Sequence, residues 1–428
     1  MTRRFVPILV VLALAFPALA KSARVSDEDI VSAYHYMVAR WIILRQEASD
    51  FRGNFKWNQI FHRDASSDVA RAYPYLEAAY SEAWIYTDET SCTEIEVPKI
   101  TGRYYTVQVM NGWGEVVANI NDRTYPKHPF GKFALCTKGT KIYLPPDTQR
   151  VDVPGTKSRV VMRIELGADP AQAHALQNQV TMKPTGDPLP EELPAVLNFP
   201  QDRMPGVEGF DNIAVVLASE IDINPGMSSL QKKARAVGRA AADAAERARI
   251  DEVITKQAIP AFFAERTKLR TVQNGWFHPP ALGNYGSDYL TRSISVLTGL
   301  WPNVSKEVMY YRATSLDGGK TFTQTWPKSA LPTEKAAFFW SVTAVRAMEH
   351  RVLANSLSRY QLQKHSELKY NPDGSLTIAY GPGAPAGVPE SNWLPTVAGQ
   401  KYDLMWRFYG PTKDVINGKF YPPPLVAK

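Results

Sequence analysis

Hydrophobic and polar positions alternate with a period of two residues in two separate parts of the chain. The clearest runs are residues 105–109 and 160–166 in the first part and residues 402–408 in the second. Because successive side chains of a β-strand point to opposite faces, each run predicts a half-buried strand. Turn-forming pairs such as Asn111-Gly112 and Asp373-Gly374 separate such runs, and the second pair predicts a hairpin. The pattern therefore predicts a mainly β protein with helical additions.

A helical period occurs in two further stretches. Apolar residues spaced by four, three, four and three positions form one helix face: Ile30, Tyr34, Met37, Trp41 and Leu44. Ser26 precedes this stretch as an expected N-cap, with Asp29 three residues later. Residues 228–256 combine strong helix formers with mixed charges and predict a packed connector helix. The alternative for the connector is a helix that binds a partner.

Residues 1–20 have the pattern of a secretory signal peptide. Arg3 and Arg4 are followed by an apolar run, and Ala18 and Ala20 are small residues of the kind that signal peptidase recognises. The apolar run falls short of the roughly 20 residues that a membrane-spanning helix needs. We therefore expect cleavage after Ala20 and a periplasmic or secreted protein with no later transmembrane segment, the alternative being an uncleaved anchor.

Composition and charge narrow the class of protein further. A length of 428 residues favours two or three domains, and 11% aromatic residues with 32 prolines indicate a folded, turn-rich chain. The net charge of +7 is modest for this length. Because the basic residues are spread along the chain instead of clustered, nucleic acid is not an expected partner.

The two cysteines, Cys92 and Cys136, both fall in the first β part of the chain. An even number of cysteines in an exported protein predicts one disulfide, the alternative being two buried thiols. No two of the seven histidines stand two, three or four residues apart. The sequence therefore predicts neither a metal site nor a cofactor.

Longer motifs resemble two families that are known only by number. The segments Asn392-Trp393-Leu394-Pro395 and Trp406-Arg407-Phe408-Tyr409 resemble the family called domain of unknown function 1214. The segments Tyr80-Ser81-Glu82-Ala83-Trp84 and Arg103-Tyr104-Tyr105-Thr106-Val107-Gln108 resemble domain of unknown function 1254, which usually precedes it in bacterial secreted proteins. The resemblance implies two β-sandwich domains, each like a jelly roll, and it implies no particular reaction. Within the second family's motifs, we expect Trp393 to lie in the core and Arg407 to make structural contacts.

The pattern and the resemblance together divide the chain into five parts. These are a signal peptide (1–20), an N-terminal helical segment (21–58), a first β domain (59–170), a linker with connector helices (171–275) and a second β domain (276–428).

Short catalytic motifs do not occur, which leaves paired carboxylates as the chemistry to consider. No serine has the Gly-x-Ser-x-Gly frame of a nucleophile elbow. Hydrolases of sugars on β scaffolds need two acids about 5 to 10 Å apart. The candidates are Glu77, Glu82, Asp88, Glu89, Asp288 and Asp317, and their spacing in the sequence does not show which of them converge. As ligand-binding candidates we select Glu77, Glu82, Arg103 and His62.

These observations favour a noncatalytic ligand-binding or assembly protein. Its expected partner is a small molecule, an envelope component or another copy of the chain. The alternative is a hydrolase that acts on an envelope or environmental substrate through convergent carboxylates. A cleft containing such carboxylates or histidines would favour the hydrolase, and a cleft lined by aromatic and aliphatic groups would favour the binding protein.

Overall fold

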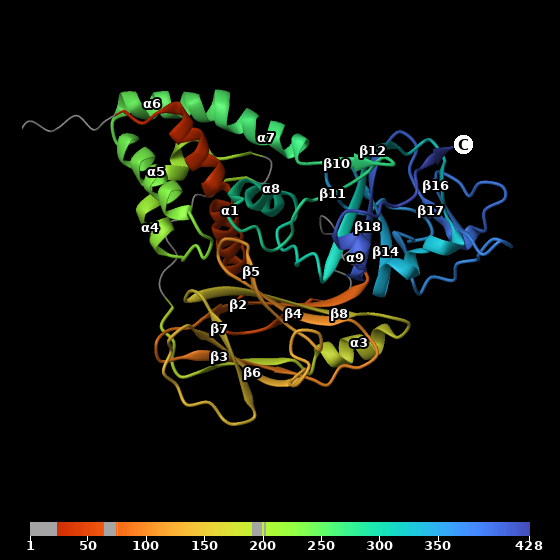
Figure 1. Ribbon diagram of the computed structural model, residues 1–428, viewed down its shortest axis with the longest axis horizontal. Helices are drawn as coiled ribbons and strands as arrows, with labels where there is room; N and C mark the ends of the chain where they lie inside the picture. Colours follow the sequence, from red (N-terminus) through yellow and green to blue (C-terminus); the bar gives the residue numbers. More distant parts are fainter. Residues whose placement is uncertain (1–23, 64–73, 75, 191–198, 201–202) are drawn as a thin grey trace, which may run out of the picture.

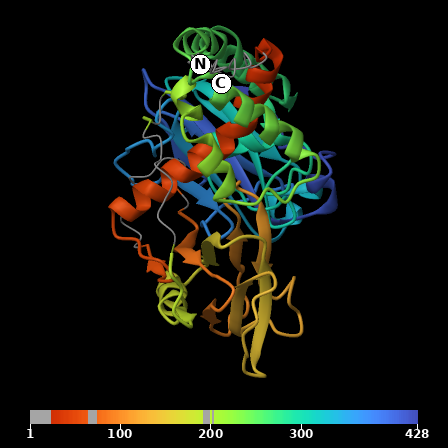
Figure 2. The ribbon, with the colours of Figure 1, turned by 90° about the vertical axis from the view of Figure 1, so that its left-hand side faces the viewer.

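The computed structural model describes residues 24–63, 74, 76–190, 199–200 and 203–428. The expected signal peptide and its cleavage position lie outside these residues. The described residues form two β domains and a group of helices, which occupy separate regions of Figure 1. In Figure 2, the first β domain projects below both the group of helices and the second β domain. The described helices include none that is long and apolar enough to span a membrane.

The first β domain consists of two packed sheets. The first sheet contains, in order, β1 (Phe61–His62), β2 (Ala78–Tyr86), β8 (Lys157–Glu165), β4 (Tyr105–Met110) and β5 (Val116–Ile120). The second contains β7 (Thr148–Val153), β6 (Gly131–Thr137), β3 (Cys92–Val97) and β9 (Thr181–Thr185). Residues of both sheets, such as Val107 and Phe133, share one buried core. Cys92 and Cys136 face each other on β3 and β6 and form a disulfide with Cα atoms 4.5 Å apart.

The first sheet differs from the sequence prediction because both of its faces are buried. Strands β2, β4 and β8 are buried at every position. One face, with residues such as Val107 and Ile164, packs on the domain's own core. The other face carries polar groups such as Arg163 and Gln108 and is covered by other parts of the chain. The prediction of half-buried strands was wrong for this sheet, because residues distant in sequence cover its polar face.

Most of the helices pack in one group with the long N-terminal helix. The helices are α1 (Asp27–Arg52), α3 (Pro170–Gln177), α4 (Ile213–Ala218), α5 (Met227–Ala240), α6 (Ala244–Val253), α7 (Ile259–Lys268), α8 (Tyr289–Thr298) and α9 (Lys413–Ile416), with a π-helical turn at Ile254–Ala258 and 3-10 turns at Val207–Phe210, Lys328–Ala330, Pro332–Lys335 and Glu390–Asn392. Outside the group, α3 lies against the first sheet of the first β domain and α9 lies in the second β domain. As predicted, Ser26 caps α1 and its hydroxyl accepts a hydrogen bond from the Asp29 amide at 3.1 Å. The single connector helix predicted over 228–256 is two helices, because Asp243 accepts from the Ala245 and Glu246 amides and begins α6.

The second β domain also consists of two sheets that enclose an aromatic core. The larger sheet contains, in order, β10 (Thr271–Gln273), β11 (Trp276–His278), β12 (Val308–Asp317), β18 (Lys401–Pro411), β14 (Ala336–Arg346) and β15 (Gln361–Gln363). The smaller contains β17 (Trp393–Pro395), β16 (Leu376–Gly381), β13 (Phe322–Trp326) and β19 (Val426–Ala427). Trp326 and Trp406 from the two sheets lie with ring centroids 4.6 Å apart. Residues 402–408 of β18 are all buried, so the prediction of a half-buried strand was wrong here too. The fold is thus mainly β, while the jelly-roll strand order stays a prediction.

The predicted hairpin at Asp373-Gly374 is not a simple hairpin, and neither is the turn that follows Asp317. Gly374 has a φ of 80° and closes a turn in which its amide donates to Asn371, but only the following segment, β16, is a strand. The turn after Asp317 joins β12 to β13, which lie in different sheets. Asp317 therefore directs the chain from one layer of the sandwich to the other.

Candidate functional site

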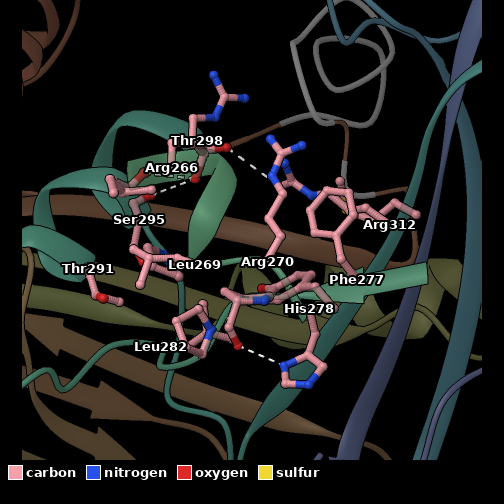
Figure 3. Close-up of a pocket in the computed structure, with 17 residues that line it drawn as sticks. Arg266, Leu269, Arg270, Phe277, His278, Leu282, Thr291, Ser295, Thr298 and Arg312 are labelled. Carbon is pink, nitrogen blue, oxygen red and sulfur yellow. Dashed lines mark hydrogen bonds between the residues drawn. The ribbon is translucent and has the colours of Figure 1, made fainter. Parts of the chain in front are cut away.

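A cavity of about 90 Å³ lies where α7 and α8 meet the second β domain. Its walls come from the end of α7, from β11 and the loop that follows, from α8, and from β12 and β18. Figure 3 shows Arg270 and Arg312 on one side of this cavity, with Phe277 beside them, and Leu282 on the opposite side. The cavity is therefore a polarised site between segments that are far apart in sequence.

Three arginines form the charged end of the cavity. Arg266 lies in the last turn of α7, Arg270 follows that helix, and Arg312 lies on β12. Arg312 donates through Nη2 to the Thr298 carbonyl at 3.5 Å, and the Arg270 guanidinium lies 4.5 Å from the centroid of the Phe277 ring. The C-terminal ends of α7 and α8 favour cations nearby. Local structure therefore holds the guanidinium groups on one side of the cavity.

The three guanidinium groups outnumber the carboxylate of Asp403 behind them, so this end of the cavity is positive. Burial raises the pKa of Asp403, against the opposing effects of Arg312, Arg270 and Arg266. His350 Nδ1 lies 3.7 Å from Asp403 Oδ2. Burial and the neighbouring arginines lower the pKa of His350 to about 4, so its imidazole is neutral at pH 7. Among the described residues that line the cavity there is no aspartate or glutamate. The cavity therefore favours an anion.

The other end of the cavity is mainly apolar. Leu282 and Ile294 contribute hydrocarbon surface there, while Phe277 and Met405 add apolar surface beside Arg312, which they flank on the neighbouring strands. Thr298 also lines the cavity, but its hydroxyl donates to the Ile294 carbonyl at 2.9 Å and is therefore satisfied within α8. A cationic end beside an apolar end suits a molecule with one negative group and a hydrocarbon body.

The four ligand-binding candidates chosen from the sequence do not line this cavity. His62 Nδ1 pairs with the Ser81 hydroxyl at 2.8 Å, and burial lowers the pKa of His62. Glu82 pairs with Arg63 and with Arg159, whose Nη2 lies 2.8 Å from Glu82 Oε2. Glu82 thus contacts protein groups at the polar face of the first sheet, whereas His62 and Ser81 lie on the face of β2 that carries the core residues Ala79 and Ala83.

Glu77 and Arg103 also contact protein groups. Glu77 Oε1 lies 3.5 Å from Arg407 Nη1 and accepts a hydrogen bond from the Tyr409 hydroxyl at 3.1 Å. Arg103 donates to the carbonyls of Glu165 and Leu166 at 2.7 and 3.1 Å. A ligand role for the four candidates stays a prediction.

The other candidate carboxylates stabilise turns and helix ends. Asp88 accepts from the Thr90 amide at 2.9 Å, and Asp317 accepts from the Gly319 amide at the same distance. Asp288 caps α8, and Glu89 is exposed. The described residues include no group of three or more histidines, cysteines or acids that could hold a metal ion. The described cavity thus lacks the convergent acids that the hydrolase alternative requires.

The sequence reasoning missed the three arginines of the cavity. Arg266 and Arg270 are four residues apart near the end of a helical pattern, which is a weak local signal for a basic site. Arg312 belongs to a strand more than forty residues away, so only the folded chain brings it beside the others.

The fold defines a two-domain, mainly β class of protein, and comparisons assign its parts. Residues 57–184 match the family described as protein of unknown function DUF1254, and residues 311–413 match protein of unknown function DUF1214. The chain therefore carries a DUF1254 region followed by a DUF1214 region. No curated protein matches the chain.

Solved structures of two other proteins match most of the chain with different similarity. The VPA0106 protein from Vibrio parahaemolyticus is 15% identical with a TM-score of 0.64, and the match covers 94% of this chain and 100% of that one. An uncharacterized protein from Burkholderia cenocepacia is 12% identical with a TM-score of 0.46, covering 94% and 95% of the two chains. The similarity to the VPA0106 protein shows that a protein with a very different sequence shares this fold.

Proposed function

We propose that the protein is an exported, noncatalytic binding protein whose ligand is a small monocarboxylate with an apolar body. The observation that carries the proposal is the cavity that presents three arginines and no acid at one end and hydrocarbon at the other. Guanidinium groups bind carboxylates through paired, charge-assisted hydrogen bonds. The apolar end would bury the ligand's hydrocarbon body.

The size of the cavity limits the ligand. A volume of about 90 Å³ equals on the order of six to nine water-sized volumes. Benzoate and hexanoate are somewhat larger than this volume and would reach the open side of the cavity, whereas a long fatty acid would extend much further out.

Two further observations support the proposal. Among the residues that the structure describes, the cavity lining offers no nucleophile with an adjacent base and no pair of acids, so binding explains the site without a reaction. The disulfide between Cys92 and Cys136 suits an oxidising compartment, and together with the expected signal peptide it supports export.

Calorimetric titration with benzoate and with its neutral analogue benzamide tests the proposal. We expect benzoate to bind at least about tenfold more tightly, because only the carboxylate uses the arginines. Replacement of Arg266 with methionine should weaken benzoate binding and leave benzamide binding nearly unchanged. Arg235→Met is the matched control, since Arg235 is on α5, half-buried at the surface and outside the cavity lining. Equal binding of benzoate and benzamide, or no binding of benzoate, would overturn the proposal.

A further inference from the structure

One wall of the cavity is attached to the first β domain. Gly299 and Pro302, which follow α8, line the cavity. The Trp301 carbonyl accepts a hydrogen bond from Arg163 Nη2 at 3.0 Å, and the Pro302 carbonyl accepts one from Gln108 Nε2 at 2.9 Å. This wall is irregular backbone between α8 and β12, so side chains of another domain hold it in place.

Asn303, the residue after Pro302, attaches the same wall to the first β domain a second time. Asn303 and Asn119 exchange two side-chain hydrogen bonds, at 3.0 and 2.9 Å. Gln108 and Asn119 are direct partners across β4 and β5, and Gln108 faces Val161 of β8 on its other side. The groups that hold residues 301–303 therefore form one patch on the polar face of the first sheet.

The orientation of the Gln108 amide is fixed by a second interaction. Arg163 Nη1 donates to Gln108 Oε1, and Arg163 Nε donates to the Tyr80 hydroxyl at 2.9 Å. Because a guanidinium only donates, the oxygen of the Gln108 amide must face Arg163 and its nitrogen must face Pro302. Gln108 and Arg163 are both almost fully buried, so water does not compete for these bonds.

We propose that Gln108 and Asn119 of the first β domain are positioning residues that set the size of ligand the cavity accepts. They act through Pro302 and Asn303 and do not touch the ligand. The inference rests on the proposed binding function. It gives a physical reason why the two family regions occur in one chain: the first holds a wall of the cavity, and the second supplies Arg312 and Met405 to the lining.

The variant Gln108→Glu tests this role, and it also removes the donor to the Met110 sulfur, which lies 3.0 Å from Gln108 Nε2. Glutamate has the shape of glutamine and keeps an oxygen for Arg163, but it cannot donate to the Pro302 carbonyl. The control is Gln324→Glu, which removes a similar buried bond from a glutamine to the Pro423 carbonyl in the smaller sheet of the second domain. Asn303→Asp is a second test variant, since it keeps the acceptor for Asn119 and loses the donor.

The measurement is the affinity of each variant for butanoate, hexanoate and octanoate, together with hydrogen exchange of backbone amides in residues 299–308. We expect the preference between octanoate and hexanoate to shift by about tenfold toward octanoate in Gln108→Glu and Asn303→Asp, with faster exchange of the wall. Gln324→Glu should lower stability without that shift.

The outcomes separate the two proposals. If the unaltered protein binds none of the three acids, the binding function is wrong and this inference falls with it. If it binds them and both test variants keep the original chain-length preference, only the positioning role is wrong. A shift of the same size in Gln324→Glu would also overturn it, because loss of stability alone would then account for the change.

Discussion

Replacement of Glu220 with glutamine is expected to change how the stability of the protein depends on pH. Glu220 follows α4 and is only 4% exposed. Its carboxylate lies against two glycines: a Cβ atom at Gly112 or Gly155 would come within 2.7 and 2.6 Å of its oxygens. Burial raises the pKa of Glu220 to about 7, while Arg40 and the Gly112 amide act in the opposite direction.

The sign and size of the effect follow from this pKa. The ordinary glutamate value is 4.5, so between about pH 4.5 and about pH 7 the unfolded chain loses this proton before the folded protein does. The free energy of unfolding therefore falls as the pH rises through this window and is constant above it. The displacement of the Glu220 pKa corresponds to a loss of about 3 kcal/mol in the free energy of unfolding across this window. Glutamine is neutral at every pH and removes this fall.

Urea unfolding with the disulfide intact, followed by tryptophan fluorescence at pH 4.5 to 8, measures the effect. The free energy of unfolding of Glu220→Gln, taken relative to that of the unaltered protein, should rise by on the order of 3 kcal/mol from pH 4.5 to pH 8. Glu252→Gln is the control, because Glu252 is exposed and its pKa is lowered by Lys256. If the free energies of unfolding of Glu220→Gln and of the unaltered protein change in parallel across this pH range, the raised pKa of buried Glu220 is refuted.

Three further changes test individual contacts. Replacing Cys92 and Cys136 with serine should cost about 4 kcal/mol in urea unfolding, because the disulfide closes a sequence separation of 44 residues; an unchanged midpoint would contradict this. Arg407→Met should cost about 3 to 5 kcal/mol by leaving Glu77 buried without its cation, and adding Glu77→Gln should recover part of the loss; a thermal scan that shows no loss would speak against the buried pair. Arg103→Met should speed hydrogen exchange in residues 170–177, because Arg103 holds the chain before α3, and unchanged exchange would remove that role.

Local structure was largely predictable from the sequence. The period of Ile30 to Leu44 and the cap at Ser26 gave α1, because both depend on neighbouring residues. The strand at residues 105–109 was predicted for the same reason. The burial of its polar face was not, since the covering groups come from elsewhere: the Tyr104 hydroxyl at this sheet donates to Glu307, 203 positions away, at 2.9 Å.

Individual side chains show the same limit. Arg407 makes the structural contacts that were predicted, donating to the Pro74 carbonyl at 2.9 Å and to the Thr343 hydroxyl at 2.8 Å. Trp393 was predicted to lie in the core and is only partly buried, because β17 is an edge strand of the smaller sheet; its indole nitrogen donates to the Gly381 carbonyl at 2.8 Å. The cavity depends on distances between Arg266, Arg312 and other distant residues, and periodicity carries no information about such distances.

A crystal structure of the protein with benzoate tests the central claim most directly. We predict that the benzoate carboxylate lies within hydrogen-bond distance of at least two of Arg266, Arg270 and Arg312, with its ring against Leu282 and Met405. An empty cavity at a saturating concentration of benzoate, or a ring that enters the cavity with its carboxylate directed away from the arginines, would contradict the claim.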